Sequence, residues 1–306
     1  MRLTRRSLLG VRNSLVGFFR RNLYAFFRGV FDAIEPWSLD NNRWSRLASL
    51  VFWLSSRTKV VWSDSANLFR VQTGEDYIFV ARRKRLKLFL NGIQWRFGSL
   101  SDSYGLSWVP DGPSGLVVDV GANIGEFSRI LADRGNHVVA IEPDPEEFRA
   151  LTSNLGSEAN CFQSALWSKK MRKTLFYAND SGDTSLFRPE SRNQHEQNVT
   201  TVTLDEILET IGRSGEGIKI LKLEAEGAEP EVLLGAKKAL ERTEWILADL
   251  GFERGAEKKS TVSHAASILL PLGFEIIDIL PKRLVVVFRR SSLENTFSER
   301  RSSLDP

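Results

Sequence analysis

Two carboxylates in the middle of the chain have the spacing of a nucleoside-binding βαβ unit. Asp119 interrupts a short apolar run, and Glu142 directly follows the next such run, 21 residues after Gly121. A carboxylate at this second position is where such folds bind the hydroxyls of a ribose. Gly121 and Gly125 allow the backbone to turn tightly and to approach a ligand where a helix begins. These residues therefore predict nucleoside binding.

The loop between these carboxylates narrows the choice of ligand. A dinucleotide site needs three glycines in the order G-x-G-x-x-G, whereas Asn123 occupies the place of the middle glycine here. Two acidic groups favour a cationic nucleoside over a phosphate. S-adenosylmethionine, a sulfonium with an amino acid tail, has that chemistry. The alternative is an ordinary α/β turn with a chance acidic residue.

A second acidic cluster follows the apolar run at residues 218–223. Glu224, Glu226 and Glu229 lie within six residues of one another. In open α/β sheets ligands bind beyond the carboxyl ends of the strands, so Glu224 and Glu226 are expected to face the same crevice as Asp119. Alternatively, Glu226 and Glu229 only stabilise a helix N-terminus, where negative charge is favourable.

These motifs resemble, in order and spacing, the FkbM family of S-adenosylmethionine-dependent methyltransferases. The resemblance covers about residues 70–290 and rests on four segments: VVDVGANIGEFS, IEPDPEEF with Asn154 closing the following helix, TLDEIL, and LKLEAEGAEPEVLLGA. It implies a class I methyltransferase fold, which is Rossmann-like, with S-adenosyl-L-methionine as cofactor. It also implies O-methylation, most often of a sugar hydroxyl or a polyketide-type alcohol. One departure is Glu224-Ala225-Glu226, where the family usually has Asp-Val-Glu.

The expected site residues follow from the motifs and the resemblance. For the cofactor they are Asp119, Gly121, Asn123, Gly125, Glu142, Pro143, Ser164, Ala165 and Glu224. The protein must mainly align an alcohol oxygen with an activated methyl group and remove its proton. Glu224, Glu226 and His195 are the catalytic candidates, because a carboxylate near other carboxylates has a raised pKa. A metal-assisted route has no dedicated ligand signature, and no metal is expected.

Alternating patterns of apolar runs and helical segments predict the elements that hold these residues. Strands are expected near 116–120, 137–142, 160–165, 218–224, 245–250, 274–280 and 283–289, with helices between the first six. Only Pro281-Lys282 separates the last two, so the final strand should run antiparallel in a mostly parallel sheet of seven strands. The expected organisation is a helical leader at 1–56, a β-rich lead-in at 57–112, the methyltransferase domain at 113–290 and a disordered tail at 291–306.

Two polar segments lie outside the predicted seven-stranded sheet. Residues 179–199 are predicted to form a loop over the strand ends that acts as a substrate lid, in which His195 and Arg188 could contact a sugar or a carboxylate. A surface loop without such contact is equally consistent with the pattern. The basic run at 82–87 is predicted to be a solvated hairpin of two short strands.

Charge is distributed unevenly along the chain. The formal net charge is +4, but residues 1–31 carry seven arginines and no acidic residue, so the remaining 275 residues sum to −3. A nucleic-acid substrate would leave a basic footprint on the catalytic part and is not expected. The single cysteine, Cys161, excludes an intrachain disulfide and is expected to pack in the core. The three histidines lack the spacing of a zinc site.

The N-terminal residues have the pattern of a basic amphipathic helix, with arginines opposite an apolar face over residues 2–30. Three roles fit: contact with an anionic membrane surface, an organelle presequence, or packing on the catalytic domain. The segment from Trp44 to Trp62 is too short and too charged for a spanning helix. We expect a cytoplasmic protein, peripheral at the inner face of a membrane, whose partner is a small-molecule or glycan acceptor. The sequence does not predict its oligomeric state.

Two other classes of function remain open. An NAD-dependent oxidoreductase would use the same βαβ unit, but the middle glycine is missing. A non-catalytic membrane-associated scaffold would have no need for the acidic residues at 119, 142, 224 and 226.

Overall fold

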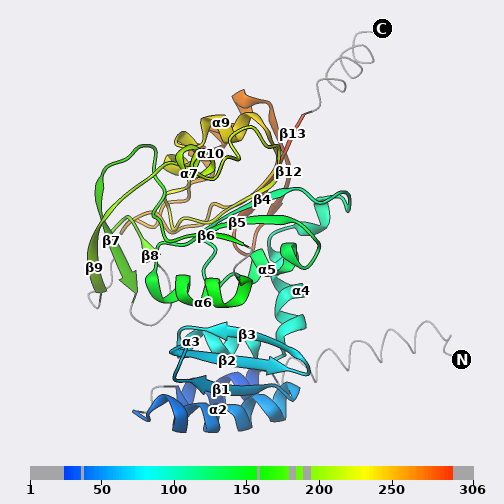
Figure 1. Ribbon diagram of the computed structural model, residues 1–306, viewed down its shortest axis with the longest axis vertical. Helices are drawn as coiled ribbons and strands as arrows, with labels where there is room; N and C mark the ends of the chain where they lie inside the picture. The colour runs from blue at the N-terminus through cyan, green and yellow to red at the C-terminus, as the bar shows by residue number, and fades with distance from the viewer. Residues whose placement is uncertain (1–23, 36–37, 157–158, 179–183, 189–193, 292–306) are drawn as a thin grey trace, which may run out of the picture. The chain divides into compact units, whose positions relative to one another are not determined.

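The computed structural model describes residues 24–35, 38–156, 159–178, 184–188 and 194–291 (Figure 1). The chain divides into two compact units, residues 1–96 and 97–306. Most of the predicted N-terminal helix and nearly all of the predicted tail lie outside the described residues. Among the helices of the described ranges, none has the length and apolar character needed to cross a bilayer.

The first unit packs two helices with a small antiparallel sheet. A helix covers residues 24–34, and α2 follows at Asn41–Ser56. The strands β1 (Lys59–Ser63), β2 (Leu68–Thr73) and β3 (Asp76–Val80) pair in the order β1-β2-β3. Aromatic rings form the core, with Phe31 edge-on to Trp44 and Phe52 and with Trp44 against Phe69.

The prediction of a hairpin in the basic run at 82–87 is wrong. This segment forms α3 (Arg83–Leu86) and the 3-10 turn η1 (Lys87–Phe89), and α4 (Ile93–Ser103) follows. The reason is a helical period, because Leu86, Phe89 and Leu90 are spaced at i, i+3 and i+4 and all are fully buried. The Arg83 guanidinium donates to Asn41 Oδ1 and to Leu39 O, so part of the basic run is tied into the fold.

The second unit is built on a seven-stranded sheet in the order β12-β13-β11-β10-β4-β5-β6. Its strands are β4 (Leu116–Val120), β5 (His137–Ile141), β6 (Asn160–Phe162), β10 (Ile218–Leu223), β11 (Thr243–Asp249), β12 (Phe274–Leu280) and β13 (Val285–Arg290). All seven predicted strands are present, with ends shifted by a few residues. β13 runs antiparallel to both β11 and β12, whereas the other four pairs of neighbouring strands are parallel. The predicted mostly parallel sheet with an antiparallel last strand is confirmed.

Helices lie on both sides of this sheet. α5 (Glu126–Ala132) and α6 (Pro145–Leu155) lie on one side, and α7 (Leu204–Thr210), α9 (Lys237–Glu241) and α10 (Val262–Leu269) lie on the other (Figure 1). α8 (Glu229–Leu234) packs against α10, and η2 (Leu106–Trp108) and η3 (Leu270–Leu272) complete the helical elements. Every residue of β4 is buried, which explains why this strand reads as a nearly continuous apolar run. Cys161 on β6 is only half-buried, and burial raises the pKa of its thiol to about 11.

A second, three-stranded sheet replaces part of the predicted polar loop. It pairs β7 (Arg172–Ala178) with β8 (Thr184–Ser185) and β9 (Gln194–Thr200) in the order β8-β7-β9. The loop prediction is therefore wrong for 194–199, while 179–183 and 189–193 lie outside the described residues. Period-2 alternation is absent from β9, because His195, Glu196, Gln197 and Asn198 are all exposed. Backbone pairing with β7, rather than a buried face, defines this strand.

Candidate active site

Glu142 lies at the carboxyl end of β5, where backbone groups fix its carboxylate. Asn123 N donates to Glu142 Oε2 over 2.8 Å, and Asp144 N donates to Oε1 over 2.8 Å. Asn123 has a φ of +52°, which turns its N–H toward Glu142. Burial raises the pKa of Glu142 to about 8, although both backbone donors act in the opposite direction.

The loop around Glu142 fits a nucleoside. Each oxygen of Glu142 accepts one backbone N–H and keeps a second lone pair that a ribose hydroxyl can use. Within the described part of the chain, Asn123 Oδ1 is a buried oxygen that makes no hydrogen bond. Pro143 and Ser164 are half-buried and Ala165 is buried, at the ends of β5 and beyond β6. These residues have the chemistry to hold an adenosine moiety, and their contacts with the cofactor stay a prediction.

Asp119 lies beneath the strand ends rather than at their surface. Its side chain is fully buried, and Ser128 Oγ donates to its Oδ2 over 2.6 Å. The Lys222 ammonium lies 3.1 Å from its Oδ1. Asp119 is therefore enclosed by the described groups, and Lys222 connects it to Glu224. Direct contact with the cofactor stays a prediction.

Lys222 was not among the predicted site residues, yet it joins β4 to β10. Its ammonium lies 3.1 Å from Glu224 Oε2 and donates to Val120 O over 3.1 Å and to Gly121 O over 2.6 Å. The available signal was a lysine within a buried apolar run, two residues before a glutamate. A buried cation in that position needs anionic partners.

Glu224 is held by three groups at the carboxyl end of β10. The Tyr104 hydroxyl and the Arg283 guanidinium both contact its carboxylate, in addition to Lys222. Arg283 also contacts Asp249 Oδ2 over 2.7 Å. Burial alone would raise the pKa of Glu224, but Lys222 and Arg283 overcome that effect and lower it to about 2. The expectation of a raised pKa is wrong for Glu224, which remains ionised and is a poor proton acceptor at neutral pH.

Glu229 shapes the loop that presents Glu226. Glu229 Oε1 accepts hydrogen bonds from Ala225 N at 2.9 Å and Gly227 N at 3.0 Å, and Thr261 Oγ1 donates to Oε2 over 2.8 Å. Glu226 is half-buried and has a φ of +48°. Glu229 is therefore a structural residue, while Glu226 lies in the loop directly after β10.

The inserted sheet contacts two of these strand ends. Thr184 Oγ1 donates to Asp144 Oδ2 over 3.0 Å, and Ser185 Oγ donates to Glu226 O over 2.9 Å. β8 thus connects the Glu142 side of the crevice with the Glu226 side. His195 is exposed on β9, where it lies opposite Tyr177 of β7, and its part in catalysis stays a prediction.

Glu253, in the loop after β11, is a half-buried carboxylate that was not predicted. A Cβ placed on Gly251 would lie 3.3 Å from Asp249 Oδ1 and 3.9 Å from Glu253 Cδ, so both carboxyl groups lie beside Gly251. Burial and the nearby charges of Asp249 and Glu224 raise the pKa of Glu253 to about 8.

Arg254 fixes the loop that carries Glu253. Its guanidinium donates to Gly227 O over 2.7 Å and to both oxygens of Glu231, over 2.8 and 2.6 Å. Because Gly227 directly follows Glu226, this contact holds Glu253 and Glu226 on neighbouring loops. No sequence pattern marks Glu253, since its neighbours Phe252 and Arg254 belong to an irregular segment.

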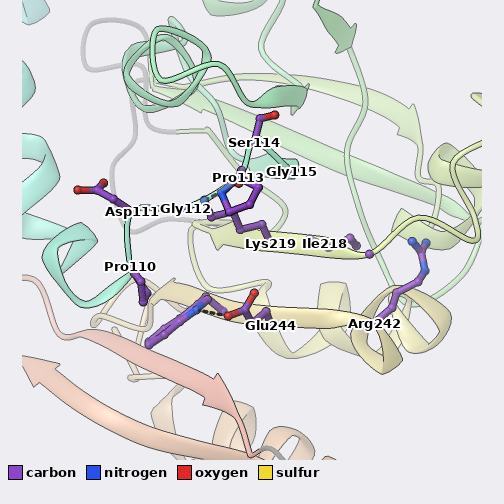
Figure 2. A pocket seen from close by; sticks show the side chains of 12 residues that line it. Pro110, Asp111, Gly112, Pro113, Ser114, Gly115, Ile218, Lys219, Arg242 and Glu244 are labelled. Carbon is purple, nitrogen blue, oxygen red and sulfur yellow. Dashed lines mark hydrogen bonds between the residues drawn. The ribbon is translucent and has the colours of Figure 1, made fainter.

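A hollow at the opposite edge of the sheet is separate from this site. The hollow has a volume of about 500 Å³ and lies at the amino ends of β4, β10 and β11 (Figure 2). It is lined by Pro110, Asp111, Gly112, Pro113, Ser114, Gly115, Gly217, Ile218, Lys219, Arg242, Glu244 and Trp245. Ligands of open α/β sheets bind at the carboxyl ends of the strands, so this hollow is not assigned to the active site.

The fold and the acidic strand ends agree with a known protein family. Residues 119–282 match the family described as the methyltransferase FkbM domain, and the chain belongs to this family. The fold is therefore that of a class I methyltransferase, the methyl donor is S-adenosylmethionine, and the protein is a methyltransferase. The resemblance predicted from the four motifs is confirmed.

Two curated proteins are similar to parts of the chain. The 2-O-methyltransferase NoeI of Sinorhizobium fredii is 25% identical over 224 residues, which cover 67% of this chain and 90% of NoeI. The AMB antimetabolite synthetase AmbE of Pseudomonas aeruginosa is 30% identical over 204 residues, or 54% of this chain. The matched segment spans only 10% of AmbE.

Solved structures show more distant similarity. Magnesium protoporphyrin IX methyltransferase (ChlM) from Synechocystis PCC 6803 with bound SAM has a TM-score of 0.37 and 13% identity, over 68% of this chain and 83% of that one. A ribosomal protein L11 methylase from Lactobacillus delbrueckii subsp. bulgaricus has a TM-score of 0.35 and 10% identity, over 64% and 78%.

Proposed function

We propose that the protein is an O-methyltransferase that acts on a hydroxyl of a sugar, glycan or polyketide-like small molecule. The observation that carries this proposal is the partly exposed carboxylate of Glu253 beside the Glu224–Arg283–Asp249 cluster, because an alcohol must lose a proton as it is methylated. The name of NoeI, a 2-O-methyltransferase, supports an oxygen acceptor, and the sugar or polyketide class of the acceptor follows from what the family resemblance implies.

The cofactor supplies a methyl group that its sulfonium already activates. The chain must hold the adenosine, orient the acceptor and take up one proton. Glu142, whose carboxylate is oriented by the Asn123 N–H, binds the ribose. Orientation is the larger contribution to rate, since an oxygen held in line gains effective molarities of about 10⁵ M or more.

Glu224 and Glu253 have different roles in the proposed reaction. Glu224 stays ionised because Lys222, Arg283 and Tyr104 contact it, so it provides fixed negative charge rather than proton transfer. Glu253 has a pKa of about 8 and accepts the hydroxyl proton as the new C–O bond forms. Glu226 lies on the adjacent loop and remains, with His195, an alternative proton acceptor.

The inserted sheet is the element of the chain that we assign to acceptor selection. β8 spans from Asp144 to Glu226, and both contacts come from hydroxyl side chains that hold it at the crevice. A different acceptor can then be accommodated by changes in β7 to β9 without changes in the cofactor loop.

Calorimetric titration with S-adenosylmethionine and with NAD is the first experiment, and we expect binding of the former alone. Transfer of an isotopically labelled methyl group is then measured on matched acceptors that carry a free hydroxyl, an amine at the same position, or neither. Label in an ether product supports the proposal. Label only in the amine product would refute O-methylation, and tight NAD binding would favour the oxidoreductase alternative.

A further inference from the structure

Charge is strongly separated between the two compact units. Residues 1–96 contain 18 Lys and Arg residues and six Asp and Glu residues, a net charge of +12. Residues 97–306 contain 24 basic and 32 acidic residues, a net charge of −8. A small unit with such an excess of cations attracts polyanionic surfaces, so the first unit is the part of the chain to search for one.

The outer face of α2 joins cations to exposed apolar side chains. Leu50, Trp53 and Leu54 are 57%, 48% and 55% exposed. Arg46 and Arg57 are exposed four residues before and three residues after this apolar group. The spacing of three and four residues places Arg46, Leu50, Trp53 and Leu54 on one face of the helix. Arg57 is the C-cap residue of α2, and its guanidinium lies 5.9 Å from the centre of the Trp53 ring. We call these five residues the α2 stripe.

The fold itself does not need the α2 stripe. The opposite face of α2 buries Trp44, Ala48, Val51 and Phe52, and these residues form the contact with the sheet of the first unit. α2 contains no acidic residue, and its N-terminus is capped by Asp40, which accepts from Arg43 N over 2.9 Å. An apolar group left exposed between cations marks an interaction surface.

We propose that the α2 stripe binds the surface of a membrane containing anionic lipids. Arginines would contact the headgroups, while Leu50, Trp53 and Leu54 insert at the boundary of the acyl chains, where tryptophan is favoured. Nucleic acid would also attract the cations, but it does not require exposed leucines at helical spacing. The arginine-rich residues 1–31 add charge of the same sign to this unit.

Co-sedimentation of the full-length protein with vesicles tests the proposal. One set of vesicles contains phosphatidylcholine alone, and the other contains phosphatidylcholine with phosphatidylglycerol. We expect binding to the anionic vesicles only, weakened by high salt. Arg46→Glu combined with Arg57→Glu should lower the binding constant about tenfold or more, because each cation near such a surface contributes about fivefold. Trp53→Ser combined with Leu54→Ser should lower it comparably.

Matched controls lie in the second unit, where Lys237 and Lys238 are exposed cations and Leu270 and Leu272 are 46% and 43% exposed. Lys237→Glu with Lys238→Glu, and Leu270→Ser with Leu272→Ser, should leave vesicle binding unchanged.

If one of the stripe variants has a lowered melting temperature, Leu50→Ser is tested in its place. Wild-type binding by both stripe variants would overturn the proposal. So would displacement of the protein from the vesicles by a short RNA that it binds more tightly.

Discussion

The backbone of Gly121 lies directly against the backbone of Glu224. A Cβ placed on Gly121 would come within 1.9 Å of the Glu224 carbonyl oxygen, and Glu224 N donates to Val120 O over 3.2 Å. Gly121 also has a φ of +69°. The loop after β4 and the end of β10 are therefore in contact without any side chain between them. The glycine that was predicted to admit a ligand is required first by the packing of two strand ends.

Gly121→Ala should accordingly destabilise the protein by more than its left-handed backbone alone explains. A left-handed conformation costs a non-glycine residue about 1–2 kcal/mol. Gly135 provides the matched control, because its φ is +82° and a Cβ there would meet nothing within 4 Å. We expect Gly135→Ala to lower the free energy of unfolding by about 1 kcal/mol and Gly121→Ala by about 3 kcal/mol or more. Urea denaturation measures both. Equal losses would show that the loop moves away from β10 without cost.

Lys222→Met should be strongly destabilising. The substitution keeps the length of the side chain but leaves Asp119 and Glu224 without the ammonium that lies 3.1 Å from each. Removing one member of a buried ion pair costs about 3–5 kcal/mol. Lys219→Met is the control, because Lys219 lies on the same strand and its ammonium reaches Pro113 O in an exposed position. Its loss should change the unfolding free energy by about 0.5 kcal/mol or less.

A smaller loss of unfolding free energy for Lys222→Met than for Lys219→Met would contradict the stabilising role of the Lys222 ion pairs. It would mean that Asp119 and Glu224 protonate readily when the cation is removed. Measuring both variants at pH 5 and at pH 8 separates the cases, since protonation of the carboxylates relieves the uncompensated charge at the lower pH.

Nucleoside binding should depend on the ionisation of Glu142. Both of its oxygens accept hydrogen bonds from the ribose hydroxyls with full strength only in the deprotonated form, and burial raises its pKa to about 8 in the free protein. Affinity should therefore increase as the pH rises from 6 to 8, by about tenfold or more, and level off above that range. Titration with 5′-methylthioadenosine measures this effect without the titratable amino acid group of the cofactor.

Glu142→Gln should bind more weakly and with little dependence on pH, because the amide does not titrate. Glu146→Gln, an exposed position in the first turn of α6, is the control and should keep the wild-type profile. A pH dependence retained by Glu142→Gln would assign the titrating group elsewhere.

The parts of the structure that follow from local pattern were predictable. The apolar runs located β4, β5 and β10, and the carboxyl ends of parallel strands share one edge, which placed Glu142, Glu224 and Glu226 together. Local pattern does not reveal how residues far apart pair. Tyr104 and Glu224 are separated by 120 residues, and Arg283 reaches Glu224 from 59 residues away. The lowered pKa of Glu224 depends on these distant partners, so the proton acceptor could not be identified from the positions of acidic residues in the sequence.

The predictions for the polar strand β9 and for the basic helical segment at 82–87 were wrong for different reasons. β9 has exposed side chains at four successive positions, so no apolar alternation marks it as a strand. In the segment at 82–87, charged residues conceal the i, i+3, i+4 spacing of Leu86, Phe89 and Leu90. In both cases tertiary pairing or burial selected the structure, rather than the composition of the segment.

The chemistry of the proposed methyl transfer should be governed by Glu253. Its carboxylate must be deprotonated to accept the hydroxyl proton, and its pKa is raised to about 8. The rate of methyl transfer at saturating cofactor should therefore increase as the pH rises toward 8 and become constant above it. Glu253→Gln should lower kcat by about 10²-fold, abolish that rise and leave the dissociation constant of the cofactor unchanged.

Glu257→Gln is the matched control for Glu253→Gln. Glu257 lies in the same loop, is exposed, and pairs with Lys259, so its substitution should leave kcat and the pH profile as in the wild type. Glu226→Gln and His195→Gln test the alternative proton acceptors in the same assay. If Glu253→Gln keeps the wild-type rate and one of these two variants loses both the rate and the pH dependence, the residue changed in that variant is the proton acceptor.

Arg254→Lys should disturb the position of the proton acceptor, whether this is Glu253 or Glu226, because the two residues lie on loops joined by the Arg254–Gly227 contact. It should lower kcat while Glu142 still binds the nucleoside normally.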